Sequence, residues 1–183
     1  MRKLVSELDR LDRNIYAAIA DSSTPTMDEP LRRLSDFANN SKIWFVAATA
    51  MGVWGGKQGR RAALSGLVAV GATSALVNQG FKRLAERPRP DREGEDVPEE
   101  RHVFMPESTS FPSGHSASGF AFATAAGGSL PVVGPLLSSL AAAVAYSRIH
   151  AGVHYPGDVV IGSLIGGSVG AFTAWAAQRV MRS

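Results

Sequence analysis

YSRIHAGVHYPGD, residues 146–158, is the stretch around which the rest of the chain is organised. Between two long runs of small apolar residues, it holds one arginine, two histidines and one aspartate: Arg148, His150, His154 and Asp158. Pro156 disfavours helical dihedrals in the residue before it, so one regular helix cannot carry all four. We expect one helix to end near His154 and another to begin at Asp158. Asp158 is then either the N-cap of the second helix or the group that holds one ring nitrogen of His154, while the other nitrogen acts as a nucleophile.

The composition predicts a single helical domain over residues 1–183. Hydrophobic residues make up 45% of the chain and aromatic residues 8%, which suits helices that pack closely through small side chains. There are no cysteines, which excludes disulfides, a thiol nucleophile and a thiolate metal site. A net charge of +3 gives little reason to expect nucleic acid as a partner. We expect no secretory signal peptide, because MRKLVSELDRLDR lacks an apolar core followed by a cleavage site.

Five apolar runs with almost no charge follow one another along the chain: residues 43–56, 62–81, 116–130, 131–146 and 159–177. A helix needs about 20 residues to cross a hydrocarbon core of about 30 Å. We therefore predict an all-α, membrane-embedded bundle of about five spans over residues 41–178, in a multi-pass protein of the cell membrane. A soluble bundle stays open, because several runs are shorter than about 18 residues. In the last run, Gly162, Gly166 and Gly170 form a flat face that could pack within the chain or against a second copy in a homo-oligomer.

The N-terminal segment, residues 1–40, differs from these runs because it is amphipathic. Five apolar side chains share one face of a helix predicted over residues 1–20: Leu4, Leu8, Leu11, Ile15 and Ile19. This helix either lies in the membrane interface or packs on the helical core. Counting spans from residue 43 places the loops 82–115 and 147–158 on the same face as this segment. The basic loop 57–61 lies on the opposite face, which by the positive-inside rule puts the shared face outside the cytoplasm.

The first of these loops begins with KRLAERPRP, residues 82–90. It is either a basic stretch flanking a membrane span or part of a phosphate site. Lys82 offers a compact ammonium group, and Arg89 a planar fork that can bind two phosphate oxygens at once. Pro88 and Pro90 stiffen the chain around Arg89. Lys82 and Arg89 are therefore candidates for binding an anion.

FPSGHS, residues 111–116, stands at the start of the third apolar run. The free N–H groups at a helix N-terminus favour an anion. Gly114 removes a side chain where an oxyanion would approach, Ser113 adds a hydroxyl donor, and His115 lies beside the same anion. A turn with a serine cap would explain Pro112, Ser113 and Gly114, but it gives no reason for the histidine.

Together the three clusters match the signature of the type 2 phosphatidic acid phosphatase superfamily, which includes lipid phosphatases, bacterial acid phosphatases and vanadium haloperoxidases. The family pattern is Lys, six residues, Arg, Pro; then Pro-Ser-Gly-His; then Ser-Arg, five residues, His, three residues, Asp. Every position is present here: Lys82, Arg89, Pro90, Pro112, Ser113, Gly114, His115, Ser147, Arg148, His154 and Asp158. The chain resembles the small bacterial integral-membrane members that act on lipid and polyprenyl phosphates.

The resemblance implies a metal-independent lipid-phosphate phosphatase without a cofactor. Its substrate would be a phosphomonoester or diphosphate of a lipid, such as a polyprenyl-linked phosphate, phosphatidylglycerophosphate or phosphatidate. His154 would attack phosphorus to form a phosphohistidine, Asp158 would fix the imidazole, and His115 would protonate the leaving alcohol. Cations and a helix N-terminus would hold the equatorial oxygens: Lys82, Arg89, Arg148, Ser113 and Gly114.

Several alternatives stay open at this point. A metal site could be built from the histidines and the aspartate, although the neighbouring arginines favour an anion: His102, His115, His150, His154 and Asp158. The pocket could also bind anionic head groups without catalysis, or hold vanadate as in a haloperoxidase. The acidic loop 91–110 is either a solvated connection or a lid whose Val103, Phe104 and Met105 contact lipid tails.

Overall fold

The structure is a computed structural model that describes residues 2–180, and the regular elements in that range are all helices. The longer ones are α1 (Arg2–Ala20), α2 (Pro25–Phe37), α3 (Lys42–Trp54), α4 (Gly56–Ala75), α6 (Gly114–Ser129), α7 (Gly134–His150) and α8 (Pro156–Val180). Short segments join them: η1 (Asn39–Ser41), η2 (Leu76–Phe81), α5 (Lys82–Leu84), η3 (Glu99–Arg101) and η4 (Pro131–Val133). The all-α prediction is confirmed.

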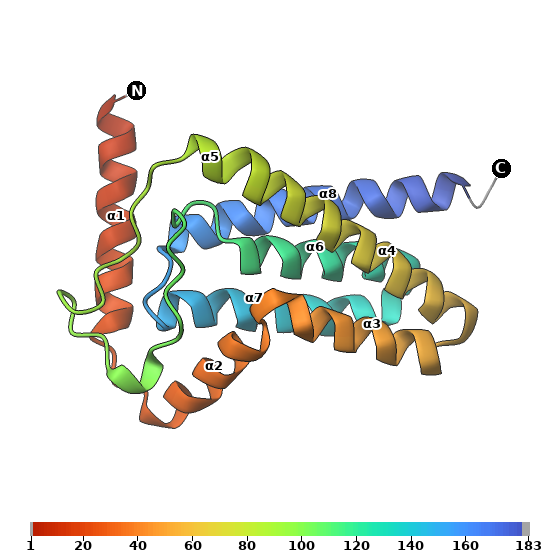
Figure 1. Cartoon of the computed structure of the whole chain (residues 1–183), viewed down its shortest axis with the longest axis horizontal. Helices are drawn as coiled ribbons and strands as arrows, with labels where there is room; N and C mark the ends of the chain where they lie inside the picture. The colour runs from red at the N-terminus through yellow and green to blue at the C-terminus, as the bar shows by residue number, and fades with distance from the viewer. Residues whose placement is uncertain (1, 181–183) are drawn as a thin grey trace.

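The centre of the bundle is α6, which contacts α4, α7 and α8 (Figure 1). Its small side chains, among them Ala117, Ala121 and Ala125, are completely buried. Trp44 of α3 packs on Phe122 of α6, with ring centroids 5.4 Å apart. Burying these two large rings removes much apolar surface from water, so they anchor α3 to the core.

The glycine face of α8 packs inside the chain. A Cβ at Gly162, Gly166 or Gly170 would overlap a backbone carbonyl oxygen of α6 or of the residue that precedes it. Only residues without a side chain allow two helices to approach this closely. The open question about this face is therefore answered in favour of packing within the chain.

Within residues 2–180, three segments are long and apolar enough to cross a membrane: Gly56–Leu84, Pro131–His150 and Pro156–Val180. The outer side of α8 exposes large apolar side chains, including Leu164 and Phe172. By contrast α3 and α6, which were counted among the five predicted spans, have only 13 and 16 residues. The membrane-embedded helical bundle is thus supported, while the number of five spans stays a prediction.

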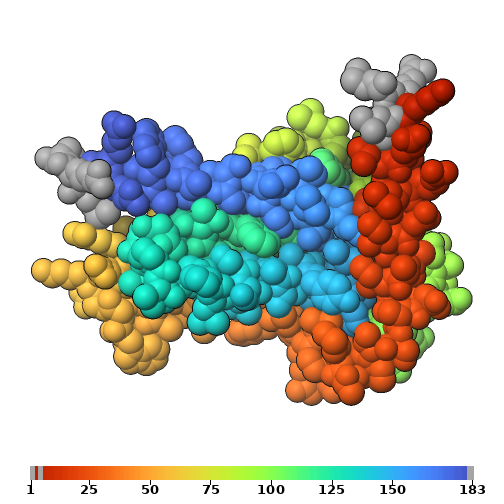
Figure 2. All heavy atoms as spheres, turned by 180° about the vertical axis from the view of Figure 1, so that it is seen from behind, coloured from red at the N-terminus to blue at the C-terminus, as the bar shows by residue number. Residues whose placement is uncertain are grey.

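One end of the bundle carries α1, which runs crosswise over it (Figure 1), and the view from behind shows α1 covering that end (Figure 2). It packs there through Tyr16, which is buried against Tyr155. Part of the predicted apolar face remains exposed: Leu8, Leu11 and Ile15. The helix predicted over residues 1–20 therefore packs on the core with one face and leaves an apolar face free.

The loop 85–113 and the turn between α7 and α8 lie at the same end as α1, whereas the α3–α4 turn lies at the other end (Figure 1). This is the arrangement that the counting of spans predicts. It brings the three sequence clusters to one end of the molecule.

Candidate active site

His154 lies in a tight turn between α7 and α8. The first helix ends at His150 and the second begins at Pro156, so the boundaries predicted at His154 and Asp158 are wrong by a few residues. The N–H of His154 donates to the carbonyl of Arg148 at 3.2 Å and closes the turn. Proline is well suited to the first turn of a helix, because its fixed φ is helical and its missing N–H is not needed there.

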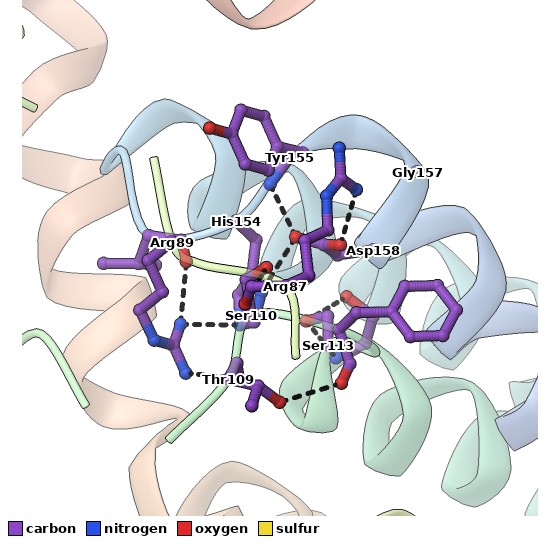
Figure 3. Close-up of polar contacts among 12 residues, drawn as sticks. Arg87, Arg89, Thr109, Ser110, Ser113, His154, Tyr155, Gly157 and Asp158 are labelled. Carbon is purple, nitrogen blue, oxygen red and sulfur yellow. Dashed lines mark hydrogen bonds and ion pairs between the residues drawn. The ribbon is translucent and has the colours of Figure 1, made fainter. Parts of the chain in front are cut away.

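Asp158 is completely buried in the first turn of α8. It is not the N-cap. Instead its Oδ2 reaches back to accept the N–H of Tyr155 at 2.9 Å, as the third residue does in a capping box. The same oxygen lies 3.6 Å from Nδ1 of His154, and Oδ1 accepts a hydrogen bond from Nη1 of Arg87 at 2.8 Å (Figure 3). The N-cap interpretation is therefore wrong, because the helix begins two residues earlier, and the carboxylate instead faces the imidazole of His154.

The imidazole of His154 is only 2% exposed. Burial is the main cause that lowers the pKa of His154 to about 4; the carboxylate of Asp158 opposes this shift and the charge of Arg89 adds to it. The ring is therefore neutral at pH 7. We assign its proton to Nδ1, which faces the carboxylate, so that the lone pair of Nε2 points towards Nη1 of Arg89, 3.4 Å away.

Three cationic side chains lie around this imidazole. Arg89 donates from Nη1 to the carbonyl of Val153 at 2.7 Å, which fixes its fork beside the histidine (Figure 3). Lys82 donates from Nζ to Oγ of Ser108 at 3.0 Å. These bonds to neutral oxygens orient the cations without neutralising them.

Arg148 is the most buried of the three, with 1% of its surface exposed. It donates from Nη1 to Oγ of Ser35 at 2.6 Å, and its Nε has no hydrogen-bond partner among the described residues. Within residues 2–180, neither Arg148 nor Lys82 nor Arg89 forms an ion pair with a carboxylate. Buried charge without a counter-ion is costly, so this arrangement favours the binding of an anion.

The N-terminus of α6 completes the site. Ser113 is its N-cap: the hydroxyl accepts hydrogen bonds from N and Oγ of Ser116, at 3.5 and 2.9 Å. The Ser113 hydroxyl is buried in this role, and its predicted contact with phosphate stays a prediction. Gly114 and His115 do line the cavity. Nε2 of His115 lies 3.0 Å from Oδ1 of Asn39, which sets the orientation of the ring.

A cavity of about 520 Å³ connects these groups. Six of the eight predicted site residues line it: Lys82, Arg89, Gly114, His115, Arg148 and His154. The buried Ser113 and Asp158 stand behind this lining. The lining also includes apolar side chains of α3 and α4, namely Trp44, Leu67 and Val70, and the exposed polar side chains of Asn40 and Asn78 at the rim. The cavity therefore combines cationic, apolar and neutral polar groups.

Two residues of the site were not found from the sequence. Arg87 binds Asp158, and the only hint of it was that KRLAERPRP contains two more arginines, Arg83 and Arg87, than the family pattern. Asn39 contacts His115 from a segment 76 residues away, and no local pattern marks it.

The histidine cluster that a metal site would require is not formed. Nε2 of His150 lies 3.1 Å from Oδ1 of Asp28 and 3.0 Å from Oγ1 of Thr24, in the contact between α7 and α2. Nε2 of His102 lies 2.9 Å from the carbonyl oxygen of Val97. Among the residues that the structure describes, no group of three or more His, Asp or Glu is arranged to hold a metal ion.

The loop 91–110 is anchored to the bundle. Val103 is buried against Ala151 and Val153, and Nη1 of Arg92 donates to its carbonyl at 2.9 Å. The expectation that Val103 touches lipid tails is therefore wrong, because its side chain is packed inside. Phe104, by contrast, is 77% exposed and keeps the lid hypothesis open.

The sequence is similar to a described family and to proteins of two mycobacterial species. The model of a family described as the PAP2 superfamily matches residues 62–182. The decaprenylphosphoryl-5-phosphoribose phosphatase of Mycobacterium tuberculosis (strain H37Rv) is 35% identical over 161 residues, which are 86% of this chain and 83% of that protein. The protein of the same name from Mycolicibacterium smegmatis is 37% identical over 151 residues, 81% of this chain and 77% of that protein.

Solved structures with the same architecture include a transmembrane PAP2 type phosphatidylglycerolphosphate phosphatase from Bacillus subtilis. Its TM-score is 0.70 at 22% identity, over 94% of this chain and 87% of that chain, and at this identity the likeness shows the fold alone. Aquifex aeolicus LpxE gives a TM-score of 0.67 at 25% identity, over 89% of this chain and 94% of that one.

Proposed function

The chain belongs to the PAP2 superfamily and is a phosphatase, and from this premise we propose that it removes the terminal phosphate from a polyprenyl-linked lipid through a phosphohistidine intermediate. The observation that carries the proposal is the group of three cations without carboxylate partners around a neutral, buried imidazole. Such an arrangement binds a phosphate dianion and presents a nucleophile to it.

In the first step, Nε2 of His154 attacks phosphorus and forms a P–N bond while the bond to the ester oxygen breaks. His115 gives its proton to the leaving alcohol. Asp158 lies beside Nδ1 and stabilises the ring as it becomes cationic. In the second step His115 takes a proton from water, the water oxygen attacks phosphorus, and the P–N bond breaks to release inorganic phosphate and neutral His154.

Charge in this transition state spreads over the equatorial oxygens of the phosphoryl group. In this proposal it is stabilised by Lys82, Arg89, Arg148 and the backbone N–H groups at the start of α6, while Gly114 leaves room for the approach; the supporting observation is that these residues line one cavity. These fixed cations supply the positive charge that a metal ion supplies in other phosphatases. We therefore expect full activity in the presence of EDTA.

The rim of the cavity supports a head group that carries hydroxyls. Asn40 and Ser41 have positive φ values of 54° and 60°, a conformation that is strained for residues other than glycine and that clusters at functional sites. Asn78 lies in η2, a π-helical segment of a kind that is also frequent at such sites. These amides and the hydroxyl suit the sugar of a prenylphosphoryl-phosphoribose, the substrate named for the mycobacterial relatives.

The placement of the chain in the membrane follows from the same arrangement. We propose that the bundle helices run across the bilayer and that α1 lies in the interface, with Leu8, Leu11 and Ile15 in contact with lipid. The cavity then opens at this interface, on the extracytoplasmic side, where a lipid can present its phosphate while its tails stay in the membrane.

Phosphate release from a panel of lipids in EDTA tests the proposal. The panel compares prenylphosphoryl-ribose 5-phosphate, prenyl monophosphate, prenyl diphosphate, phosphatidylglycerophosphate and phosphatidate, each in the same detergent. We expect the highest kcat/KM for the phosphoribose lipid, and labelled phosphate trapped on the protein after an alkaline quench, where phosphohistidine is stable. Activity that disappears in EDTA and returns with zinc or manganese would contradict the mechanism.

A further inference from the structure

Arg87 connects the active site to α1. Its guanidinium donates to three carboxylates: Nη1 to Oδ1 of Asp158 at 2.8 Å, and Nη2 to Oδ2 of Asp12 at 2.7 Å and to Oδ1 of Asp9 at 3.1 Å. Among the described residues, the lining of the phosphate cavity does not include Arg87. Arg87 is thus placed to act on Asp158 and not on the substrate (Figure 3).

Asp12 holds the turn as well as the arginine. Its Oδ1 accepts the backbone N–H of Gly157 at 2.6 Å. A Cβ at residue 157 would lie 2.9 Å from Oδ2 of Asp12, so glycine permits this approach. Tyr16 of α1 packs edge-on against Tyr155, with ring centroids 5.4 Å apart. Contacts from α1 therefore reach the residues that lie between His154 and Asp158 in the sequence.

Arg87 keeps its positive charge and can therefore act as a permanent ion-pair partner of the buried carboxylate of Asp158. Burial acts to lower the pKa of Arg87, but its hydrogen bond to Asp12 and the charge of Asp158 outweigh burial and raise the pKa. The guanidinium stays charged and holds Oδ1 of Asp158, so that Oδ2 is left facing Nδ1 of His154.

We propose that Arg87, held by Asp12 of α1, is a positioning residue that sets the carboxylate of Asp158 and through it the nucleophilic imidazole. This inference rests on the proposed function, in which His154 attacks phosphorus. It makes α1 a part of the catalytic apparatus. Loss of Arg87 misaligns the imidazole but leaves the phosphate cage in place, so kcat falls while KM is unchanged.

Arg13 provides a matched control for a role that is limited to docking α1. It also pairs with Asp9, at 2.8 Å, and its guanidinium donates to the hydroxyl of Tyr155 at 3.2 Å. Both arginines lie over the ring of Tyr155, Arg13 at 5.3 Å and Arg87 at 4.3 Å from the centroid. Of these two arginines, Arg87 is the one that contacts Asp158.

The experiment compares Arg87→Gln, Arg87→Lys, Asp12→Asn and Arg13→Gln in the full chain in detergent, with nitrophenyl phosphate as substrate. We expect Arg87→Gln to lower kcat by ~100-fold at constant KM, the scale of a nucleophile displaced by about 1 Å. Arg87→Lys should retain about a tenth of the activity, because one ammonium cannot hold Asp158 and Asp12 together as the fork does. Arg13→Gln loses only a surface ion pair, so its kcat should stay within about threefold of the wild-type value.

Two inhibitors separate positioning from a general loss of structure. Vanadate adopts the five-coordinate geometry of the transition state and bonds to the nucleophile, whereas inorganic phosphate only fills the cage. In Arg87→Gln the Ki of vanadate should rise in parallel with the loss of kcat, and the Ki of phosphate should not change. A parallel rise of both inhibition constants would overturn the proposal.

Other outcomes are equally decisive. The proposal is wrong if Arg87→Gln keeps kcat within about threefold of wild type, or if Arg13→Gln loses as much as Arg87→Gln. Should Arg87→Gln fail to fold, Asp12→Asn decides, since it keeps an acceptor for Gly157 and loses the charge opposite Arg87: a lower kcat at constant KM supports the proposal, and an unchanged kcat refutes it. A fully active His154→Ala would instead refute the proposed function itself.

Discussion

Arg101 and Arg148 are both almost completely buried, at 1% exposure each, yet their surroundings differ. Arg101 donates from Nε to Oδ1 of Asp28 at 2.9 Å and from its other nitrogens to backbone carbonyls at the end of α1 and just after it, such as that of Ile19 at 3.1 Å. Arg148 has one serine hydroxyl and, within residues 2–180, no carboxylate partner. The protein satisfies the first arginine, whereas no carboxylate in that range balances the charge of the second.

The two histidines of the organising stretch each face a carboxylate, but only one of them lines the cavity. His150 lies beside Asp28 and Thr24, in the satisfied cluster that ties α2 and the loop before α6 to α7. His154, four residues on, faces the open cavity. Charge that is paired holds the fold together, and charge that is unpaired marks the place where a substrate completes the balance. The predictions below test this distinction.

The largest effect should come from the two histidines. We expect His154→Ala to lose at least ~10⁴-fold in kcat with little change in Tm, because it removes the nucleophile from a folded site. His150→Ala should keep its activity but lose about 1–3 kcal/mol of stability with its hydrogen bonds. Kinetics and thermal unfolding of both variants measure this. Near-normal turnover by a folded His154→Ala protein would contradict the assignment.

The two arginines should separate activity from stability. We expect Arg148→Gln to lose ~10²–10³-fold in kcat and to keep or raise its Tm, because it removes a buried charge without a partner. Arg101→Gln leaves Asp28 buried without its main cation and should lower the free energy of unfolding by about 3–5 kcal/mol. An equal loss of stability in Arg148→Gln and Arg101→Gln would contradict the distinction between paired and unpaired arginines.

His115 should matter only where the leaving group needs a proton. We expect His115→Ala to lose ~10²-fold in kcat on a lipid phosphate and much less on nitrophenyl phosphate, whose leaving group departs as an anion. Rates on the two substrates under one set of conditions measure this difference. An equal loss on both would argue against a general acid at this position.

The smallest expected effect is on the titration of His154, whose midpoint should lie well below the ordinary value for histidine. Since burial lowers the pKa of His154 to about 4, its ring should stay neutral as the pH falls from 7 to 5. The folded form disfavours the charged ring, so this histidine contributes stability above pH 6.5, its ordinary pKa, that is lost as the pH falls towards 4. NMR titration of the ring nitrogens, assigned with His154→Ala, measures this. A midpoint near the ordinary value would show that the ring is solvated.

Much of the fold could be predicted from the sequence because long apolar runs admit few alternatives. The runs at 62–81 and 159–177 fall within helices of the structure, and the grouping of two loops and the N-terminal segment at one end follows from alternating helix directions. The boundaries around Asp158 were wrong because a proline starts a helix as readily as an aspartate caps one.

The residues of the candidate site also fall into those that could be predicted from the sequence and those that could not. Lys82, Arg89, His115, Arg148 and His154 could be predicted because their spacings within short segments are fixed and shared with a family. Arg87, Asn39 and Asp12 could not, because each acts through a partner more than seventy residues away. Only the packing of α1 and η1 against the end of the bundle brings such groups into contact.

By itself, the sequence determined that this protein is an all-helical bundle with apolar helices, and it located the three short clusters of the candidate site. It could do so because hydrophobic periodicity and local spacing are properties of the sequence alone. Tertiary structure alone decided which buried charges are paired. Pairing depends on the distance between atoms from separate helices, and the same arginine is a structural element beside a carboxylate and a binding group without one.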